Sequence, residues 1–369
     1  MILAISSTED DHASAVLEQL DAMGVDARLL DIAAFPTELT LSVQYAATDG
    51  DDAVRAQLGD QSLDEVGAVW WRRPQPFELS PALERDVDRS FAYTECQSAL
   101  DGLWRVLDAS WINHPTRDED AARKPYQLRV AQQVGFEIPE THITNDPDRA
   151  RAFVADHGPT DTVYKAFSGT ERAWRETRVF DEDETALLDA VQHAPVIFQE
   201  YVPADVDLRI TVMGDHIFPA AIHSQETDYE VDYRMTIDSA RVEAVNLPEA
   251  VRDHIHAYMD RLGLVYGAID MRRTPDGRYV FLEINPSGQW LFIAQRTDQP
   301  MTETFARLLA RFDGQQLDSE EANVEAERAA ARRCSGPATV EARDKERTPA
   351  DTQEGPQVVS DRSESRPSE

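Results

Sequence analysis

The sequence predicts an α/β protein with more than one lobe, and three observations carry that prediction. An apolar run at 1–6, a helical pattern that stops at Gly24 and a second apolar run at 27–30 follow the strand–helix–strand order of a parallel sheet. Residues 265–272 and 278–284 indicate two strands around Thr274-Pro275-Asp276-Gly277, a strong turn signal. With 369 residues, the chain is long enough for two or three lobes and a large core.

The other elements follow from local patterns along the chain. Helical spacing and breakers predict helices at 80–107, 117–133, 247–262 and 301–312, with Gly135 and Gly263 ending the second and third. Short apolar runs predict strands at 39–45, 68–71, 163–167, 177–180, 195–202, 208–212 and 216–222.

Composition limits the partners and the compartment. The formal net charge is −33, and of 36 basic residues only three are lysines, Lys124, Lys165 and Lys345. So acidic a surface suggests a halophilic host with a high-salt cytoplasm, and it argues against nucleic-acid or anionic-membrane binding. Two lone cysteines predict neither a disulfide framework nor a Cys-based zinc site. The chain lacks an apolar run of about 18 residues, so we expect a soluble, cytoplasmic protein.

Three oxygen-bearing side chains are expected on one face of the 265–284 hairpin. Closing the turn pairs Asp270 with Phe281, which places Asp270, Glu283 and Asn285 on one side and makes the two acids diagonal neighbours roughly 7–8 Å apart. Two buried carboxylates repel each other unless a cation lies between them. Two carboxylates and an amide suit Mg²⁺. The alternative is an ordinary half-polar hairpin with solvated acids.

This hairpin resembles the metal site of the ATP-grasp ligases, which carry an Asp on one strand and Glu-x-Asn on the next. The resemblance covers roughly residues 1–312 and implies an ATP-grasp fold, with a pre-ATP-grasp α/β lobe at 1–112 and two α+β lobes sandwiching ATP at 113–312. The hinge would lie near 199–203, and 313–369 would be a disordered acidic tail. The implied cofactors are ATP and Mg²⁺, with two ions, Mn²⁺ being the alternative metal.

Two lysines and a hinge segment are the nucleotide-binding candidates. Where lysine is this scarce, Lys124 and Lys165 are expected in roles that arginine cannot fill, such as a compact ammonium in a phosphate site, although chance survival is the alternative. In the family a lysine from each of these elements contacts phosphate. The resemblance further assigns hinge backbone to Tyr201 and Val202, and ribose or hinge carboxylates to Glu200 and Asp207.

Several strings resemble a narrower branch, the microviridin-type ligases that macrocyclise ribosomal peptides. These are Trp70 to Pro74, Ser224-Gln225 and Asp232-Tyr233-Arg234. Arg209, Arg234 and Arg272 are candidate catalytic residues for the charge on an acyl phosphate. The adjacent Arg72 and Arg73 could bind an anion or a peptide carboxylate, or they could be solvated guanidinium groups beside a packed aromatic pair. One departure is Gly169, a single glycine where many relatives have a glycine-rich lid.

The resemblance implies ATP-dependent ligation of a carboxylate to an amine or hydroxyl through an acyl phosphate. The first hypothesis is amide or ester formation in a ribosomal peptide. The second is a ligase for a small amino acid or a protein C-terminus, like glutathione synthetase or the glutamate-adding relatives. The third is a non-catalytic protein of this fold that binds nucleotide or peptide. Related ligases often pair, which suggests a homodimer.

Overall fold

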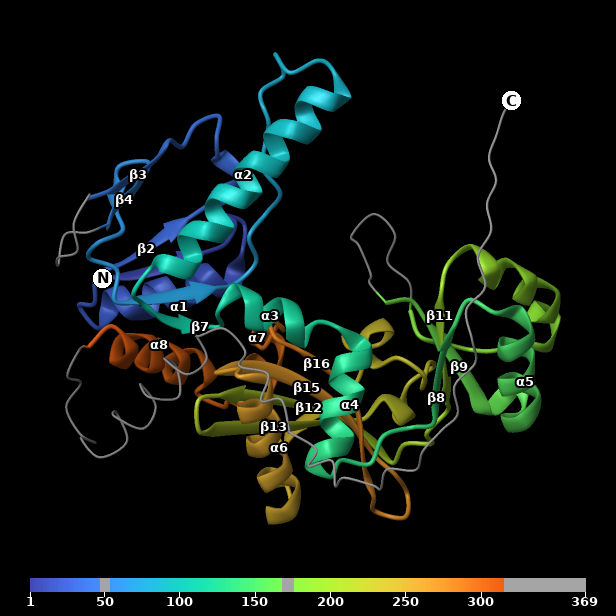
Figure 1. Cartoon of the computed structure of the whole chain (residues 1–369). Coiled ribbons are helices and arrows are strands. Elements are labelled where there is room, and N and C mark those ends of the chain that lie inside the picture. Colours follow the sequence, from blue (N-terminus) through green and yellow to red (C-terminus); the bar gives the residue numbers. More distant parts are fainter. Residues whose placement is uncertain (47–53, 168–175, 315–369) are drawn as a thin grey trace, which may run out of the picture. The chain divides into compact units, whose positions relative to one another are not determined.

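The computed structural model describes residues 1–46, 54–167 and 176–314 (Figure 1). The predicted tail from 315 onward, and Gly169 with its neighbours, lie outside the described residues. In the described ranges the strands form four sheets. No helix in these ranges has both the length and the apolar character needed to cross a membrane.

The first sheet is parallel, as the opening of the chain predicts. Its order is β2-β1-β6-β7, formed by β1 (Ile2–Ile5), β2 (Ala27–Leu30), β6 (Ala68–Trp71) and β7 (Ser110–Ile112). Helix α1 (Asp11–Ala22) joins β1 to β2, a short 3-10 turn η1 (Ile32–Ala34) follows β2, and α2 (Asp86–Val106) precedes β7. A small antiparallel sheet contains β3 (Leu41–Tyr45), β4 (Val54–Leu58) and β5 (Gln61–Ser62). β4, β5 and β7 were not predicted; β5 and β7 are too short to show a period.

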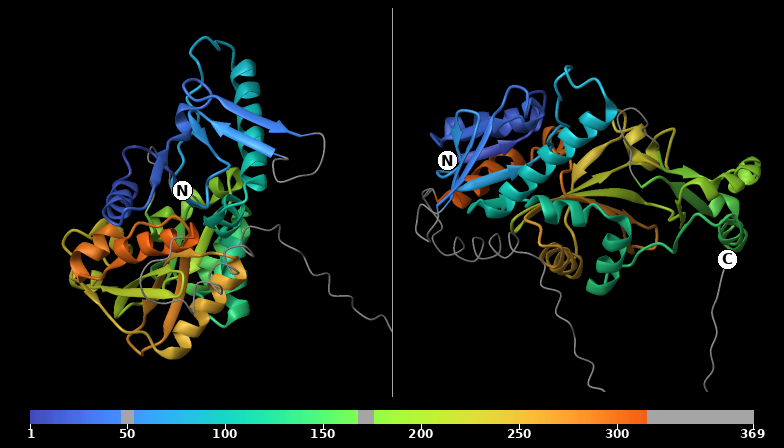
Figure 2. Two further views of the ribbon diagram at one scale, coloured as in Figure 1. Left: turned by 90° about the vertical axis from the view of Figure 1, so that its left-hand side faces the viewer. Right: turned by 45° about the horizontal axis from the view of Figure 1, so that its top comes forward.

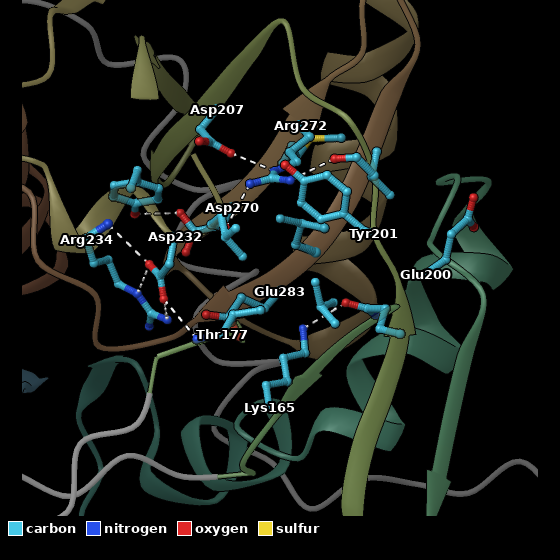
Figure 3. Close-up of a pocket in the computed structure, with 17 residues that line it drawn as sticks. Lys165, Thr177, Glu200, Tyr201, Asp207, Asp232, Arg234, Asp270, Arg272 and Glu283 are labelled. Atoms are coloured by element: carbon cyan, nitrogen blue, oxygen red, sulfur yellow. Dashed lines mark hydrogen bonds and ion pairs between the residues drawn. The ribbon is translucent and has the colours of Figure 1, made fainter. Parts of the chain in front are cut away.

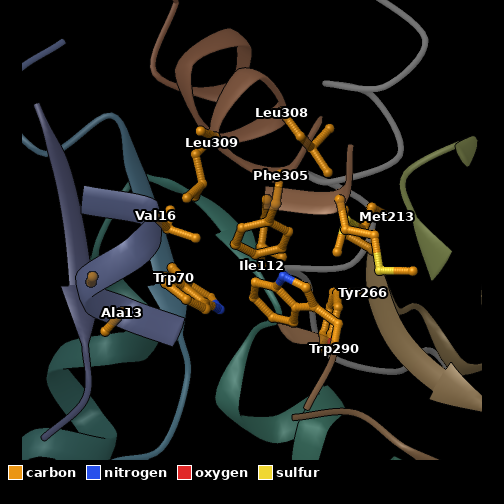
Figure 4. Close-up of a cluster of buried hydrophobic side chains, with 14 of the residues drawn as sticks. Ala13, Val16, Trp70, Ile112, Met213, Tyr266, Trp290, Phe305, Leu308 and Leu309 are labelled. Carbon is orange, nitrogen blue, oxygen red and sulfur yellow. The ribbon is translucent and has the colours of Figure 1, made fainter. Parts of the chain in front are cut away.

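Aromatic side chains from both ends of the described chain form one core cluster (Figure 4). Trp70 of β6 and Trp290 both pack on Phe305 of α8 (Met301–Phe312), with ring centroids 4.8 and 5.2 Å away. Val16 of α1 and Tyr266 belong to the same cluster. The parallel sheet is therefore packed against elements that follow the predicted 265–284 hairpin in sequence.

A second antiparallel sheet has the order β10-β9-β11-β8. Its strands are β8 (Thr141–Thr144), β9 (Thr162–Lys165), β10 (Arg178–Val179) and β11 (Val196–Glu200). Phe153 of α5 (Pro147–His157) and Leu188 of the 3-10 stretch η3 (Glu182–His193) pack with Phe198 of β11. Another 3-10 turn, η2 (Pro159–Asp161), leads into β9. Helix α5 and strand β8 were not predicted.

The largest sheet has five antiparallel strands in the order β14-β13-β12-β15-β16. These are β12 (Val206–Met213), β13 (His216–Ile222), β14 (Val242–Ala244), β15 (Tyr266–Arg273) and β16 (Tyr279–Asn285). Helices α4 (Lys124–Val134) and α6 (Glu249–Leu262) share a hydrophobic cluster with these strands and lie beside them in Figures 1 and 2. The short helix α7 (Leu291–Thr297) follows β16.

The helix predicted at 117–133 is two helices, α3 (Pro115–Ala121) and α4. Pro125 has no N–H and therefore cannot bond the Ala121 carbonyl, so the helix stops and restarts with proline in its first turn. The side chain of Gln127 takes over that bond, with its Nε2 donating to the Ala121 carbonyl at 2.6 Å.

The predicted register of the β15–β16 hairpin was wrong. The turn closes as expected, with the Gly277 N–H donating to the Thr274 carbonyl, but a β-bulge places Leu282 as an extra residue on β16. Asp270 therefore faces Glu283 directly, and Phe281 faces Met271. Asp270 and Glu283 are thus direct cross-strand neighbours instead of diagonal ones.

Candidate active site

Most of the predicted site residues line one pocket (Figure 3). The pocket is bounded by the ends of β9 and β11, by β12, β15 and β16, and by the segment around η5 (Tyr233–Met235). The predicted residues that line it are Lys165, Glu200, Tyr201, Val202, Asp207, Arg234, Asp270, Arg272 and Glu283.

A second cavity shares four lining residues with the first, namely Tyr233, Arg234, Asp270 and Glu283. It adds the predicted Arg209 and Asn285. All three predicted metal ligands therefore line this second cavity. Lys124 lines neither cavity, but its ammonium is paired with the Glu283 carboxylate.

The two acids of the predicted metal site each have a cation. Arg209 on β12 lies opposite Asp270 on β15, and its Nη1 donates to both carboxylate oxygens at 3.0 and 2.9 Å. The Tyr233 hydroxyl donates to Asp270 Oδ1 at 3.0 Å. Burial acts to raise the pKa of Glu283, but the positive charges of Lys124 and Lys165 outweigh it and lower that pKa. Glu283 is therefore an anion at neutral pH.

The donor atoms of this group fit a hard divalent ion. Asp270 and Glu283 supply carboxylate oxygens, and Asn285 supplies an amide oxygen that accepts the Ser287 N–H at 3.0 Å. The described part of the chain contains no group of three or more His, Cys, Asp or Glu side chains that could hold a metal ion. The predicted set is thus two acids and one amide, which leaves positions for water and phosphate oxygens.

Lys165 lies at the end of β9, and its Nζ donates to Gln199 Oε1 at 3.0 Å. Gln199 is fixed in turn by a bond from its Nε2 to the Thr141 hydroxyl. Burial lowers the pKa of Lys165 to about 8, although Glu283 acts in the opposite direction. The ammonium is therefore held by one neutral partner, near the site's carboxylates.

Arg272 lies behind the predicted hinge and makes four hydrogen bonds to protein groups. Its Nε donates to Asp207 at 2.9 Å, its Nη1 to the Val202 carbonyl at 2.7 Å, and its Nη2 to two carbonyls of the 230–231 segment. The guanidinium also lies 5.2 Å from the ring centroid of Tyr201. Such a side chain shapes the pocket wall, and four of its five N–H groups already bond protein atoms.

The two carboxylates assigned to ribose or hinge are occupied by other groups. Asp207 is buried, with one oxygen accepting from Arg272 and the other from the Ser224 hydroxyl. Burial raises the pKa of Asp207 against the effect of Arg272. Glu200 accepts from the Glu140 N–H at 3.3 Å, and Figure 3 shows its carboxylate turned away from the other labelled side chains.

Arg234 is held by an aspartate two residues before it. Its Nε and Nη2 donate to the two oxygens of Asp232 at 2.7 and 2.5 Å. Asp232 also accepts the Thr177 N–H at 3.2 Å, and the Tyr229 hydroxyl donates to the Thr177 carbonyl at 3.0 Å. The segment around η5 is therefore tied to the start of β10.

The two neighbouring arginines that follow β6, Arg72 and Arg73, have different surroundings. Arg72 is buried and bonds Asp10 and the backbone of the 287–288 segment, so it is a structural residue. Arg73 lines the second cavity together with Arg209 and Arg234. Arg73 therefore supports the anion-binding alternative, whereas Arg72 fits neither alternative, because it is buried and bonds protein groups instead of being a solvated guanidinium beside the aromatic pair.

Sequence reasoning did not assign site roles to Asp232, Tyr233 and Gln199. The first two lie in the Asp-Tyr-Arg string, which could have pointed to them, since an acid and a tyrosine beside a site arginine are its natural partners. Gln199 and Glu200 are the two polar residues that end the otherwise apolar strand β11, and Gln199 could have been singled out beside Glu200 on that signal.

Comparison with known proteins identifies the family and the fold of this chain. A family model described as the MvdD pre-ATP grasp domain matches residues 1–119. The macrocyclase MdnC of Microcystis aeruginosa MRC, crystallised with its precursor peptide MdnA, is 30% identical with a TM-score of 0.73, and the match covers 84% of this chain and 99% of that chain.

Two further structures extend the comparison. A RiPP-associated ATP-grasp ligase of Chryseobacterium gregarium, in complex with ADP and a leader and core peptide, is 27% identical with a TM-score of 0.75, covering 84% of this chain and 96% of that chain. The ATP-grasp ligase PsnB, complexed with minimal precursor, Mg and ADP, shares the fold at 23% identity and a TM-score of 0.69, covering 85% of this chain and 97% of PsnB. The search of curated proteins gave no match. The chain therefore belongs to the ATP-grasp ligases of the microviridin, or graspetide, type, a family of enzymes that use ATP.

Proposed function

We propose that this enzyme uses ATP to join a carboxylate of a ribosomal peptide to an amine or hydroxyl group of the same peptide. The observation that carries the proposal is the pair of adjoining cavities. One reaches the hinge, the other is lined by Arg73, Arg209 and Arg234, and the acids Asp270 and Glu283 are common to both. Phosphates and a substrate carboxylate could therefore meet at these acids.

The first cavity is the proposed ATP site. The backbone at Tyr201 and Val202 would meet the adenine, and Lys165 and Lys124 would hold phosphate oxygens. Asp207 keeps Arg272 in place behind Tyr201, so both are assigned positioning roles at the hinge. For Arg272 this replaces the catalytic role expected from sequence, because its N–H groups bond protein atoms.

Asp270, Glu283 and Asn285 would hold Mg²⁺, in two ions, with Mn²⁺ as a substitute. When bound, the metal would neutralise charge on the β- and γ-phosphates. The presence of Mg and ADP with minimal precursor in the PsnB structure supports the choice of Mg²⁺ as the metal. The protein's own contribution is a rigid set of oxygen donors on two paired strands.

The second cavity is the proposed site of the substrate carboxylate. Guanidinium forks bind carboxylates through paired hydrogen bonds, and Arg73 reaches this cavity with such a fork. Arg234 lines the cavity too, but its Nε and Nη2 bond Asp232, so its contribution would be its positive charge. A carboxylate oxygen attacks the γ-phosphorus and the bond to the bridging oxygen of ADP breaks, which gives an acyl phosphate. An amine or hydroxyl then attacks the acyl carbon, loses its proton, and phosphate leaves. Arg209 and Arg234 would stabilise the developing charge.

Three outcomes separate this proposal from its alternatives. ADP release is measured with Mg-ATP at high salt, first with acid-rich peptides encoded beside the gene and then with free amino acids. A mass loss of one water per ADP on a peptide supports the proposal. ADP formation coupled to a mass gain on a small acceptor indicates an amino-acid ligase. Tight ATP binding without ADP under any condition indicates a binding protein.

The acidic composition supports a further part of the proposal, that the enzyme works in the cytoplasm of a halophilic host. The net charge of −33 should make the folded state self-repulsive at low ionic strength. We therefore expect activity and thermal stability to rise between 0.1 M KCl, where the Debye length is about 10 Å, and 2 M KCl, where it is below about 3 Å and surface charges are largely screened. Sedimentation at high salt would test the predicted homodimer.

A further inference from the structure

The segment 287–291, which follows the proposed metal ligands, is hydrogen-bonded by side chains of the lobe that contains the parallel sheet. His12 of α1 is buried, and its Nε2 accepts the backbone N–H groups of Trp290 at 3.0 Å and Leu291 at 3.2 Å. Its ring also meets the Trp290 ring edge to face, with centroids 4.6 Å apart. One imidazole thus fixes two consecutive amides that lie 278 and 279 residues away along the chain.

Arg72, the residue directly after β6, holds the same segment. Its Nη1 donates to the carbonyls of Ser287 at 2.6 Å and Gly288 at 2.9 Å. Its Nε donates to Asp10 at 3.0 Å, and the other oxygen of Asp10 lies 3.5 Å from His12 Nδ1. Asp10 is also the N-cap of α1. It therefore couples the two side chains that hold 287–291.

The other side of this segment faces the active site. Asn285 lies two residues before the 287–291 segment. Within the segment, the Gln289 carbonyl accepts a hydrogen bond from Arg209 Nη2 at 3.2 Å, while Nη1 of the same arginine donates to Asp270. The segment is closely packed, since a Cβ on Gly288 would lie 2.4 Å from the Cβ of Ala268. A shift of 287–291 would thus move Asn285 and disturb the Arg209–Asp270 pair.

We propose that His12 and Arg72 are positioning residues for the metal site, which they set through the backbone of 287–291. This inference rests on the proposed Mg²⁺ site. Outer groups that orient ligands are worth about 10- to 100-fold in metal affinity or activity when they are removed. The parallel-sheet lobe would therefore take part in catalysis without touching nucleotide or metal.

The hydrogen bonds define the state of the ring. Because Nε2 accepts two N–H groups, His12 must be neutral with its proton on Nδ1, the nitrogen nearer Asp10. Burial lowers the pKa of His12, and Arg72 and Arg73 act in the same direction against Asp10. His12→Gln keeps an acceptor at the end of a side chain of similar reach, whereas His12→Leu keeps volume and removes the acceptor.

The test compares wild type, His12→Leu, His12→Gln and a matched control, His157→Leu. His157 is a partly buried histidine of helix α5, and its ring bonds the Phe153 carbonyl. Hydrogen exchange of peptides covering 285–297 is measured first, without nucleotide. We expect His12→Leu to speed exchange at 290 and 291 by about ten-fold. Exchange elsewhere should stay unchanged, and His12→Gln should restore most of the protection.

The second measurement is the Mg²⁺ concentration that gives half the maximal rate of ADP release, together with Mg²⁺ binding to the ADP complex by calorimetry. His12→Leu should raise the half-maximal Mg²⁺ concentration and the Kd for Mg²⁺ by about 10- to 100-fold, with little change in the KM for ATP. His157→Leu should change neither quantity. Asp10→Asn, which keeps an N-cap acceptor for α1, should move them in the same direction by less. It replaces His12→Leu if that variant does not fold.

Two results would overturn the inference. One is unchanged exchange and unchanged Mg²⁺ dependence in His12→Leu, or in Asp10→Asn where that variant stands in. The other is an equal loss in His12→Gln and His12→Leu with faster exchange throughout the first lobe, which indicates a purely structural residue. If wild type releases no ADP, the proposed function fails, and exchange and calorimetry still decide the positioning role.

Discussion

Asp270 and Glu283 face each other across β15 and β16, and each carboxylate has a separate cation. Arg209 binds Asp270 from the neighbouring strand, and Lys124 reaches Glu283 from the first residue of α4. Two buried like charges at one cross-strand position would otherwise repel strongly. The bulge at Leu282 that creates this pairing also brings both acids to the border between the two cavities.

Glu283→Gln should reduce ADP release by about 10² to 10³-fold, the cost of losing one preorganised charge-stabilising group. The carboxylate is the shared partner of Lys124 and Lys165, so its removal also leaves two cations near each other. Steady-state ADP release at saturating Mg-ATP measures the effect, and circular dichroism checks that the fold is kept. Glu243→Gln, an exposed glutamate on β14, is the matched control. Normal turnover in Glu283→Gln would contradict the assignment.

Arg209→Met should lower the free energy of unfolding by about 3–5 kcal/mol, because it leaves the buried Asp270 carboxylate without its cation. Adding Asp270→Asn should restore part of that loss, since the neutral amide needs no counterion. Urea denaturation of both single variants and the double variant gives the coupling energy. A loss below about 1 kcal/mol in Arg209→Met would mean that the pair behaves like an exposed one.

Continuous apolar runs and helices with a clear apolar stripe were predictable, whereas strands of mixed polarity such as β4 and β8 and interrupted helices were not. β2, β6 and α8 begin and end where the sequence places them. α5 was missed although Asp146 and Pro147 form a good N-terminal signal, with the Asp146 side chain accepting two N–H groups. The break between α3 and α4 follows from Pro125, a local signal outweighed in the prediction by continuous apolar spacing.

Residue types at the site were predictable, but their partners were not. The scarcity of lysine singled out Lys124 and Lys165, and both lie close enough to Glu283 to lower its pKa. The cross-strand pairing of Arg209 with Asp270 depends on the register of β12 against β15, which no local pattern determines. Likewise, the commitment of Arg272 to the hinge depends on carbonyls from two distant segments.

The charge of Lys165 should set an upper pH limit for nucleotide use. Burial lowers the pKa of this lysine from its usual 10.5 to about 8, so the free enzyme loses the positive charge as pH rises through 8. We expect kcat/KM for ATP to fall above that pH in wild type. Lys165→Arg keeps its charge at all these pH values and should lose this limb, at a lower overall rate. A flat wild-type profile to pH 9.5 would contradict the prediction.

The same group affects stability in the opposite direction. Between pH 8 and 10.5 the unfolded chain binds the Lys165 proton and the folded chain does not, so this lysine increases the free energy of unfolding as pH rises. Its contribution is lost as pH falls through 8. Urea denaturation of wild type and Lys165→Met across this range isolates the contribution as the difference between the two slopes. An equal slope in both proteins would show that the pKa of Lys165 is not lowered.

Gly288→Ala tests the close packing of the segment that follows the metal ligands. The added Cβ would meet Ala268 at 2.4 Å and Arg209 Nη2 at 2.8 Å, so the backbone or Arg209 must move. Overpacking of this kind costs typically about 1–3 kcal/mol of stability. Because Arg209 holds Asp270, ADP release should fall as well.

Gly102→Ala is the matched control. Gly102 is an exposed residue inside helix α2, and a Cβ there meets nothing within 4 Å. That change should stabilise the protein by about 0.5–1 kcal/mol through helix propensity and leave ADP release unchanged. If both variants behave alike in urea denaturation and turnover, the 287–291 segment is free to shift and does not constrain the site.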